Sequence, residues 1–279
     1  MKKFRLFGMA LVAVLMGISL ASCEKENVPE GGENQGGNGN GNEQQKEEVV
    51  VEKRLVKIDG LSSDGADAEI YTFEYDDKGR VIKAIEEVSY GNDSYTNKDE
   101  YSFIWGDNAI KVTENGDSYM LTLKDGLVVN DDNGDKYTYS ESGRFIKGSN
   151  DEVGGSTTVI WDGDKFVSVS SVDSYSEEYY WDATFTYQSQ QCKYGYFPFV
   201  ALMIDFGPDP LFLANPEVAG MRTTQLPAKR SVKYSDAYQM EEEDILSFKY
   251  ELDEKGDYVS KVVVESSSGT KFTYTLTWK

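Results

Sequence analysis

Acidic side chains are the groups in this sequence best able to do chemistry, because the chain holds 49 Asp and Glu residues and no histidine. Without histidine, Ser-His-Asp and Cys-His nucleophile pairs, imidazole acid–base catalysis and the usual histidine-bearing zinc sites are excluded. Two carboxylates that flank a glycosidic bond could still hydrolyse a polysaccharide. Nothing in the spacing marks out such a pair, so we predict no catalytic residue and keep a glycoside hydrolase as an alternative function.

Two acidic segments carry the oxygen ligands that calcium prefers, Asp131-Asp132-Asn133-Gly134-Asp135 and Asp162-Gly163-Asp164. Their spacing differs from the calcium loop that has Asp or Asn at its first, third and fifth positions followed by glycine. Asp and Gly also favour tight turns, so we expect both segments at hairpin turns. The other glycines also fit turns rather than a phosphate-binding loop, and we predict no metal and no cofactor.

Aromatic side chains make up 13% of the sequence, and they could stack on sugar rings or fill a core. Most of them alternate with polar residues inside expected strands, which favours core filling. Some tyrosines that we expect to be exposed stand outside this alternation, such as Tyr90, Tyr95, Tyr175 and Tyr194. We predict these four as the candidate contacts to a ligand.

A repeat of strand, tight turn and strand must position these side chains. In residues 71–84, Tyr71, Phe73 and Tyr75 alternate with polar residues before a turn that contains Gly79. Related patterns occupy residues 101–112, 119–129, 137–147, 158–169, 248–264 and 271–279. Short turns between successive strands predict an antiparallel meander, and about a dozen strands must curl, because twisted open sheets rarely exceed about ten. We therefore predict an all-β fold, curled into a barrel or half barrel, whose turns need a positive φ at Gly79 and Gly143.

One segment, residues 188–246, interrupts the repeat of strand, tight turn and strand. It holds five of the six prolines, which are Pro198, Pro208, Pro210, Pro216 and Pro227. The apolar run from Phe199 to Phe206 and the stretch from Leu211 to Ala214 predict short helical or coiled pieces. We predict a Pro-rich, partly helical insertion that packs as a plug into the open end of the sheet. If a ligand binds, the rim where this plug meets the sheet is the first candidate place.

The N-terminus predicts export. Lys2, Lys3 and Arg5 precede an apolar run of about 15 residues, short of the roughly 20 that a membrane-spanning helix needs. Leu-Ala-Ser-Cys at residues 20–23 resembles the bacterial lipobox, which implies a signal peptide over residues 1–22 and lipid on Cys23. A secretory peptide with an accidental cysteine is the alternative. Residues 23–48, rich in Gly, Asn, Gln and Glu, then form a disordered tether, and residues 49–279 form a single β-meander domain.

The charge and the cysteines restrict the partners further. A net charge of −21 repels nucleic-acid phosphates, so we predict no nucleic-acid partner, and the membrane is expected as a partner through the N-terminal lipid alone. Cys192 is the other of two cysteines, so no internal disulfide can form once Cys23 carries lipid. We expect Cys192 to be a buried, inert thiol.

Two turns carry a resemblance to known proteins. Residues 75–83, Tyr-Asp-Asp-Lys-Gly-Arg-Val-Ile-Lys, and 139–147, Tyr-Ser-Glu-Ser-Gly-Arg-Phe-Ile-Lys, resemble the Tyr-turn-Gly-Arg units of YD-repeat proteins. The Gly-Arg pair is missing after Trp105, Leu123 and Trp161. Together with the lipobox, the tether and the chain length, these units resemble a Bacteroidetes lipoprotein family, a domain of unknown function with a porin-like fold. The resemblance implies a fold and a compartment and assigns no activity.

The combined prediction is an outer-membrane lipoprotein on the cell surface, with the periplasmic face as the alternative, that binds a glycan or another envelope protein without catalysis. An envelope glycoside hydrolase with an Asp/Glu pair and an accessory subunit of an outer-membrane transporter are the alternatives. An integral pore is not expected, because the strand face opposite the aromatics carries Thr, Ser, Glu and Lys, which belong in water.

Overall fold

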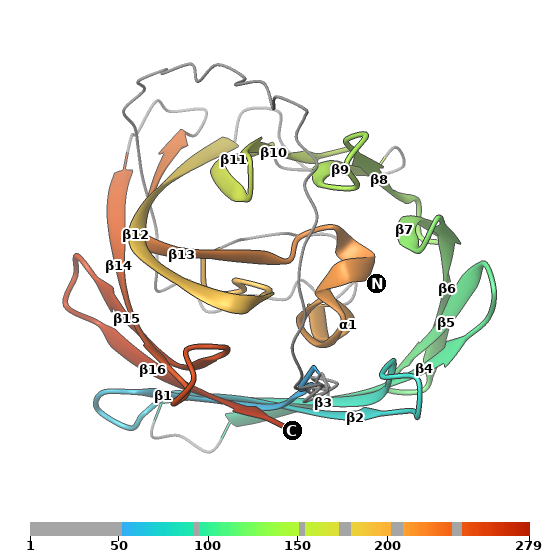
Figure 1. The fold of residues 1–279 in the computed structure, drawn as a ribbon, viewed down its shortest axis with the longest axis horizontal. Helices are drawn as coiled ribbons and strands as arrows, with labels where there is room; N and C mark the ends of the chain where they lie inside the picture. The colour runs from blue at the N-terminus through green and yellow to red at the C-terminus, as the bar shows by residue number, and fades with distance from the viewer. Residues whose placement is uncertain (1–51, 92–94, 151–153, 173–179, 202–208, 236–241) are drawn as a thin grey trace, which may run out of the picture. The chain divides into compact units, whose positions relative to one another are not determined.

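The computed structural model describes residues 52–91, 95–150, 154–172, 180–201, 209–235 and 242–279. Sixteen antiparallel strands of this part of the chain close into a barrel, in which each strand pairs with its sequence neighbours and β1 pairs with β16 (Figure 1). The all-β antiparallel meander is confirmed, and of the two forms expected the closed barrel is the one found. The strand number is higher than the predicted dozen, because several hairpins contain strands of only five or six residues.

The first eight strands are β1 (Leu55–Ser62), β2 (Ala68–Tyr75), β3 (Val81–Tyr90), β4 (Tyr95–Trp105), β5 (Ala109–Glu114), β6 (Asp117–Lys124), β7 (Leu127–Asp131) and β8 (Asp135–Tyr139). The other eight are β9 (Phe145–Asn150), β10 (Ser156–Asp162), β11 (Lys165–Val172), β12 (Tyr180–Tyr196), β13 (Thr223–Ser235), β14 (Glu242–Leu252), β15 (Val259–Ser266) and β16 (Lys271–Trp278). The two acidic segments considered for calcium lie at the turns after β7 and β10, as expected. Gly79 and Gly143 adopt the positive φ values predicted for their turns, 75° and 77°.

Alternation along the strands separates a packed interior from a polar exterior. Tyr71, Phe73, Tyr101 and Phe103 point inwards and are at most 5% exposed, and they belong to one continuous apolar core. The polar residues between them lie on the outer face, where Glu74, Ser102, Thr122, Thr138, Lys249 and Glu251 are exposed. The period of two in the sequence therefore assigned each side chain to its correct face.

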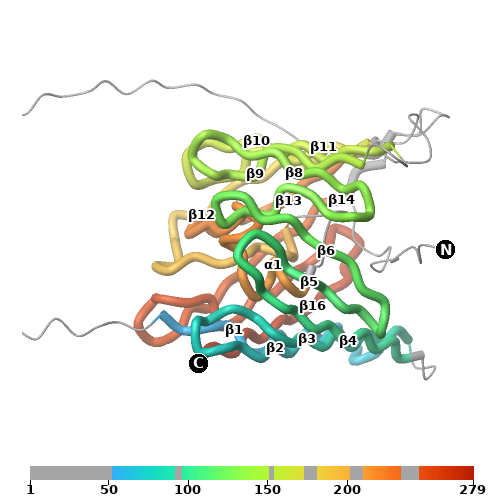
Figure 2. Tube along the Cα trace, turned by 90° about the vertical axis from the view of Figure 1, so that its right-hand side faces the viewer, coloured from blue at the N-terminus to red at the C-terminus, as the bar shows by residue number. Residues whose placement is uncertain are grey.

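The barrel has two ends, shown from the side in Figure 2. We call one the plug end: it carries the turns after β2, β4, β6, β8, β10 and β14 and both termini of the barrel wall. Arg54 and Lys279 exchange two backbone hydrogen bonds there, of 2.6 and 2.9 Å. We call the opposite one the far end, where the turns after the odd-numbered strands lie.

The segment between β12 and β13 forms the plug. It contains α1 (Asp209–Ala214) and the 3₁₀ helix η1 (Pro216–Ala219), and α1 lies inside the ring of strands in Figure 1. Leu211 and Phe212 are buried, and the Phe212 ring meets the edge of Tyr137 at a centroid distance of 6.3 Å. The predicted insertion of residues 188–246 is too long, since β12 continues to Tyr196 and β13 begins at Thr223. Pro227 lies within β13, at a register shift between β12 and β13 that accommodates it.

Both YD-like turns hold the plug in the same way. Val81 and Phe145 follow the Gly-Arg pairs, and their N–H groups donate to the plug, to Asn215 Oδ1 at 2.8 Å and to the Gly220 carbonyl at 3.1 Å. Their carbonyls accept indole N–H groups, from Trp105 at 2.6 Å and from Trp161 at 2.7 Å. The repeated sequence motif therefore has a repeated structural role.

Some predicted features cannot be compared with the structure. The signal peptide, Cys23 and the tether lie outside the described residues, and so do Tyr175 and most of the apolar run from Phe199 to Phe206. In the described part of the chain, no helix has the length and apolar character needed to cross a bilayer.

Candidate functional site

A cavity of about 430 Å³ lies at the plug end, where the plug meets the turns after β8 and β10. We call it the rim cavity. The residues that line it are Ser142, Gly143, Arg144, Gly163, Glu217, Gly220 and Arg222. The cavity lies at the rim that the sequence analysis predicts as the first candidate place for a ligand. Its volume is in the range of small-ligand sites.

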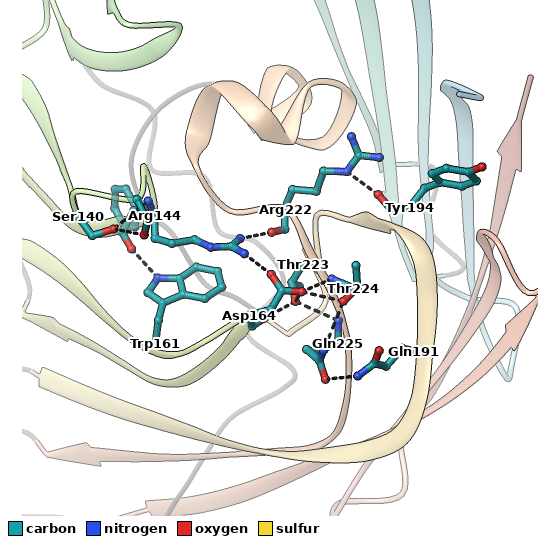
Figure 3. A network of polar contacts seen from close by, with 12 residues as sticks. Ser140, Arg144, Trp161, Asp164, Gln191, Tyr194, Arg222, Thr223, Thr224 and Gln225 are labelled. Carbon is teal, nitrogen blue, oxygen red and sulfur yellow. Dashed lines mark hydrogen bonds and ion pairs between the residues drawn. The ribbon is translucent and has the colours of Figure 1, made fainter. Parts of the chain in front are cut away.

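Asp164 fastens the wall of the cavity to the start of β13 (Figure 3). Its Oδ2 accepts hydrogen bonds from the Thr224 N–H at 2.7 Å and the Thr224 hydroxyl at 2.8 Å, and its carbonyl accepts the Thr223 hydroxyl at 2.5 Å. The other carboxylate oxygen pairs with Arg144 Nη2. One carboxylate thus joins the β10–β11 turn, the β8–β9 turn and β13.

Arg144 is held on three sides. Its guanidinium pairs with Asp164, donates to the Arg222 carbonyl and lies over the Trp161 ring at 4.8 Å. The equivalent Arg80 instead pairs within its own turn with Asp76, at 2.6 and 2.8 Å. Since the second turn has Ser140 in place of Asp76, Arg144 is available to reach across to the plug. In the second repeat the arginine therefore lies on the rim cavity.

Arg222 also belongs to the lining of the rim cavity. Its Nε donates to the Tyr194 carbonyl at 2.7 Å, which links the plug to the end of β12. The guanidinium is half-buried, and burial lowers the pKa of Arg222 from its ordinary value. The charged group is therefore partly stripped of water.

Glu217 brings the opposite charge to the cavity. It is exposed, it accepts a hydrogen bond from Asn215 Nδ2 at 2.9 Å, and one oxygen lies 3.7 Å from Arg54 Nη1. Asn215 itself is buried and also donates to the Gly79 carbonyl at 3.2 Å. The carboxylate is thus bonded to a plug residue that also bonds to the β2–β3 turn.

Of the four predicted tyrosines, those that the structure describes lie at opposite ends of the barrel. Tyr194 lies at the plug end beside Arg222, half-buried, and its ring stacks on Tyr258 with centroids 4.9 Å apart and planes at 27°. Tyr90 and Tyr95 pair across β3 and β4 at the far end, and only Tyr90 has a described side chain, which is half-buried. Tyr194 is linked to the rim cavity through its carbonyl, which accepts a hydrogen bond from the lining residue Arg222.

A second polar cluster lies inside the barrel towards the far end. The Tyr71 hydroxyl donates to Glu86 at 3.0 Å, and the Tyr274 hydroxyl donates to Glu69 at 3.1 Å. Burial raises the pKa of Glu69; the nearby carboxylates of Glu86 and Asp67 raise it further, and the bond from Tyr274 opposes them. Glu69 therefore holds a proton more tightly than an exposed glutamate does.

Cys192 is buried, as expected for an inert thiol. Its Sγ lies 3.6 Å from the Thr224 carbonyl, and burial raises its pKa to about 11. Within the ranges that the structure covers, no group of three or more Cys, Asp or Glu side chains could hold a metal ion.

Sequence reasoning missed the residues that line the rim cavity. Arg144 was noted for its Gly-Arg pair, but Glu217 and Arg222 stand in the Pro-rich segment with no motif around them. Asp164 was considered for calcium, whereas its oxygens accept hydrogen bonds from Arg144, Thr223 and Thr224. The sequence held one signal for the position of Arg144: Ser140 stands where the first repeat has Asp76.

Comparison with known proteins identifies the fold. A porin-like protein from Bacteroides uniformis aligns with a TM-score of 0.54 and 13% sequence identity, over 81% of this chain and 98% of that one. A porin-like protein from Bacteroides vulgatus aligns with a TM-score of 0.56 and 12% identity, over 82% of this chain and 99% of that one. No family model matches the chain, and no curated protein matches it. The porin-like fold is shown, whereas membership of the YD-repeat or lipoprotein families stays a prediction.

Proposed function

We propose that this chain is a tethered cell-envelope lipoprotein that binds a glycan at the rim cavity without cleaving it. The observation that carries the proposal is the cavity itself, which lies at one end of a filled barrel and has two arginines, a glutamate, a serine and three glycines among its lining residues. Charged and hydroxyl groups of this kind exchange hydrogen bonds with sugar hydroxyls. Glycines leave the backbone open to close approach by a ring.

The wall of the barrel supports a water-facing scaffold rather than a pore. Strands β7 and β8 have five residues each, which span about 17 Å, whereas a barrel in lipid shows an apolar band about 25 Å tall. The large apolar side chains with more than a third of their surface exposed are Leu61, Ile82, Ile104, Met120, Ile160 and Val172 in the described residues. Polar residues stand two positions away on the same strand face, such as Ser102 for Ile104 and Thr122 for Met120. A wall of this composition is stable in water.

The N-terminal sequence supports the tether and the compartment. With lipid on Cys23 and a flexible chain of residues 23–48, the barrel would stand about 25–30 Å from the membrane surface. Several acyl chains hold such a protein in place, since one chain gives only marginal binding. The outer membrane, with the barrel on the cell surface, is the proposed location.

The proposal is tested by a glycan array that includes host mucins and dietary polysaccharides. The full chain is purified in detergent, and binding and product release are followed together. We expect saturable binding without product. Release of shorter sugars would overturn the non-catalytic proposal, and binding to an envelope protein with silence on the array would replace it with a partner role, such as a transporter subunit.

One observation favours the hydrolase as a second candidate. Glu69 and Glu86 project into the same interior region, and the raised pKa of Glu69 is what a general acid requires. Glu86 is 5% exposed and both carboxylates are engaged by tyrosine hydroxyls, so a polysaccharide could reach them only from the far end. Hydrolysis that disappears in Glu69→Gln and survives in Arg222→Gln would establish this candidate.

A further inference from the structure

The far end of the barrel is acidic in the part that the structure describes. The far-end turns after β1, β5 and β7, taken with the strand residues that flank them, are residues 63–67, 114–117 and 131–135, and they hold Asp and Glu but no Lys or Arg. Asp64, Asp117 and Asp132 are exposed there. Lys98 and Lys136 lie just inside this end, and Lys98 is already paired with Glu87 at 3.2 Å and Glu100 at 3.3 Å.

The plug end mixes the two signs of charge. Its turns after β2, β6, β8 and β14, with their flanking residues, are 76–80, 124–126, 140–144 and 253–258, and each of them holds a lysine or an arginine beside its acidic residues. Lys78, Lys124 and Lys255 are exposed in these turns. The same kind of hairpin turn thus carries a different charge at each end of one barrel.

Ion pairs neutralise several of the plug-end carboxylates. Asp76 pairs with Arg80 Nη2 at 2.6 Å, Asp253 pairs with Lys53 at 3.0 Å, and Lys193 lies 3.3 Å from an oxygen of Asp257. These pairs join neighbouring segments of the plug end, so their charges cancel within it. Of the two ends, the plug end therefore repels an anionic surface far less.

The start of the barrel wall also lies at the plug end. Arg54 and Lys279 exchange their backbone hydrogen bonds there, directly before β1 and after β16. The chain that precedes Lys53, with Cys23 in it, is therefore joined to the barrel at this end. A lipid on Cys23 would hold the plug end nearer to the membrane, on average, than the far end.

We infer that the plug end is the face that the barrel turns towards an anionic lipid surface, with the acidic far end pointing away. Such a surface attracts lysine and repels carboxylates, and each charge beside it changes the population of an orientation about fivefold. This orientation rests on the lipid anchor of the proposed function and adds the surface that meets the membrane. The rim cavity, at the plug end, then lies on the membrane side.

Energy transfer to a membrane tests this orientation. Asn108→Cys labels the plug-end turn after β4 and Ser63→Cys labels the far-end turn after β1, and both positions are exposed and uncharged. Cys192 stays unlabelled because it is buried. The full chain is reconstituted into phosphatidylcholine vesicles that contain phosphatidylglycerol and an acceptor-labelled lipid.

The label at position 108 is expected to transfer energy to the lipid at least about twofold more efficiently than the label at position 63. This difference should shrink between about 0.01 M and 1 M salt, as the screening length falls from about 30 Å to about 3 Å. It should also be smaller on vesicles of phosphatidylcholine alone.

Two double variants assign the effect to the far-end charges. Asp117→Asn with Asp132→Asn removes exposed charges from the far end and is expected to reduce the difference between the labels. Asp77→Asn with Asp125→Asn removes exposed charges from the plug end and is the matched control that keeps or enlarges the difference. Circular dichroism melting shows that each variant is folded.

The outcomes separate this orientation from the proposed function. Equal transfer from both labels, stronger transfer from position 63, or a difference that neither salt nor the far-end variant changes would overturn the orientation, while glycan binding on the array would stand. A full chain that does not float with the vesicles would overturn the lipid anchor as well.

Discussion

Gly220 is the residue at which the plug depends most directly on the absence of a side chain. It caps η1 with a φ of +62°, and its carbonyl accepts the hydrogen bond from Phe145 N–H at 3.1 Å. A Cβ at this position would lie 2.3 Å from the Gly143 carbonyl oxygen and 3.0 Å from Phe145 N and Tyr139 Cδ1. Since two of these three neighbours are backbone atoms, Gly220→Ala must push the plug away from the β8–β9 turn.

The cost of Gly220→Ala has two parts. The left-handed conformation costs a residue with a Cβ about 1–2 kcal/mol, and overpacking against atoms that cannot move costs about 1–3 kcal/mol more. We therefore expect the free energy of unfolding to fall by about 2–5 kcal/mol. Gly256→Ala is the matched control: its φ is +73° and no atom lies within 4 Å of the added Cβ, so it carries the first part alone.

Urea unfolding followed by tryptophan fluorescence measures both variants. The difference between them, about 1–3 kcal/mol, isolates the close contact between the plug and the YD-like turn. If Gly220→Ala cost no more than Gly256→Ala, the plug would not be seated against Gly143 and the described wall of the rim cavity would be wrong.

Three more predictions follow from buried polar groups. The folded-state pKa of Glu69 lies above its unfolded value, so its contribution to stability is present at low pH and is lost as pH rises from about its ordinary 4.5 through the folded pKa. Glu69→Gln should therefore stabilise the protein at pH 7 but not at pH 4, unlike Glu74→Gln on the outer face of the same strand. An equal effect of both variants on pH-dependent melting would contradict the assignment. Asn215→Ala should cost about 1–3 kcal/mol and speed amide hydrogen exchange at Val81, whose N–H it leaves without an acceptor, and unchanged exchange at Val81 would refute the contact. The Cys192 thiol, with a pKa raised to about 11 by burial, should resist iodoacetamide at pH 8 until the chain is unfolded in urea, and rapid labelling of Cys192 in the folded protein, located by mass spectrometry, would disprove its burial.

The fold could be predicted from the sequence because its signal is local. Alternation at Tyr71, Phe73 and Tyr75 and the Asp/Gly turn after them define a hairpin without any distant information. The strand number was underestimated because five-residue strands such as β7 and β8 hold too few apolar positions to stand out. Closure depends on pairing between β1 and β16, more than 200 residues apart, and no local pattern encodes it.

The rim cavity could be located approximately but its residues could not be named. The density of prolines predicted a plug, and packing such a segment into a sheet predicted a rim. Arg144 reaches Arg222 because its guanidinium pairs with the Asp164 carboxylate and donates to the Arg222 carbonyl. Contacts of this kind join residues 78 positions apart and depend on the exact seating of the plug.

Hydrogen–deuterium exchange with the glycan that binds most tightly on the array tests the central claim most directly. The account predicts slower exchange in residues 142–144 and 217–222, with the rest of the described barrel unchanged. Protection centred on β2 and β3 around Glu69 and Glu86, or a bound glycan that slows exchange nowhere near the plug, would contradict binding at the rim cavity.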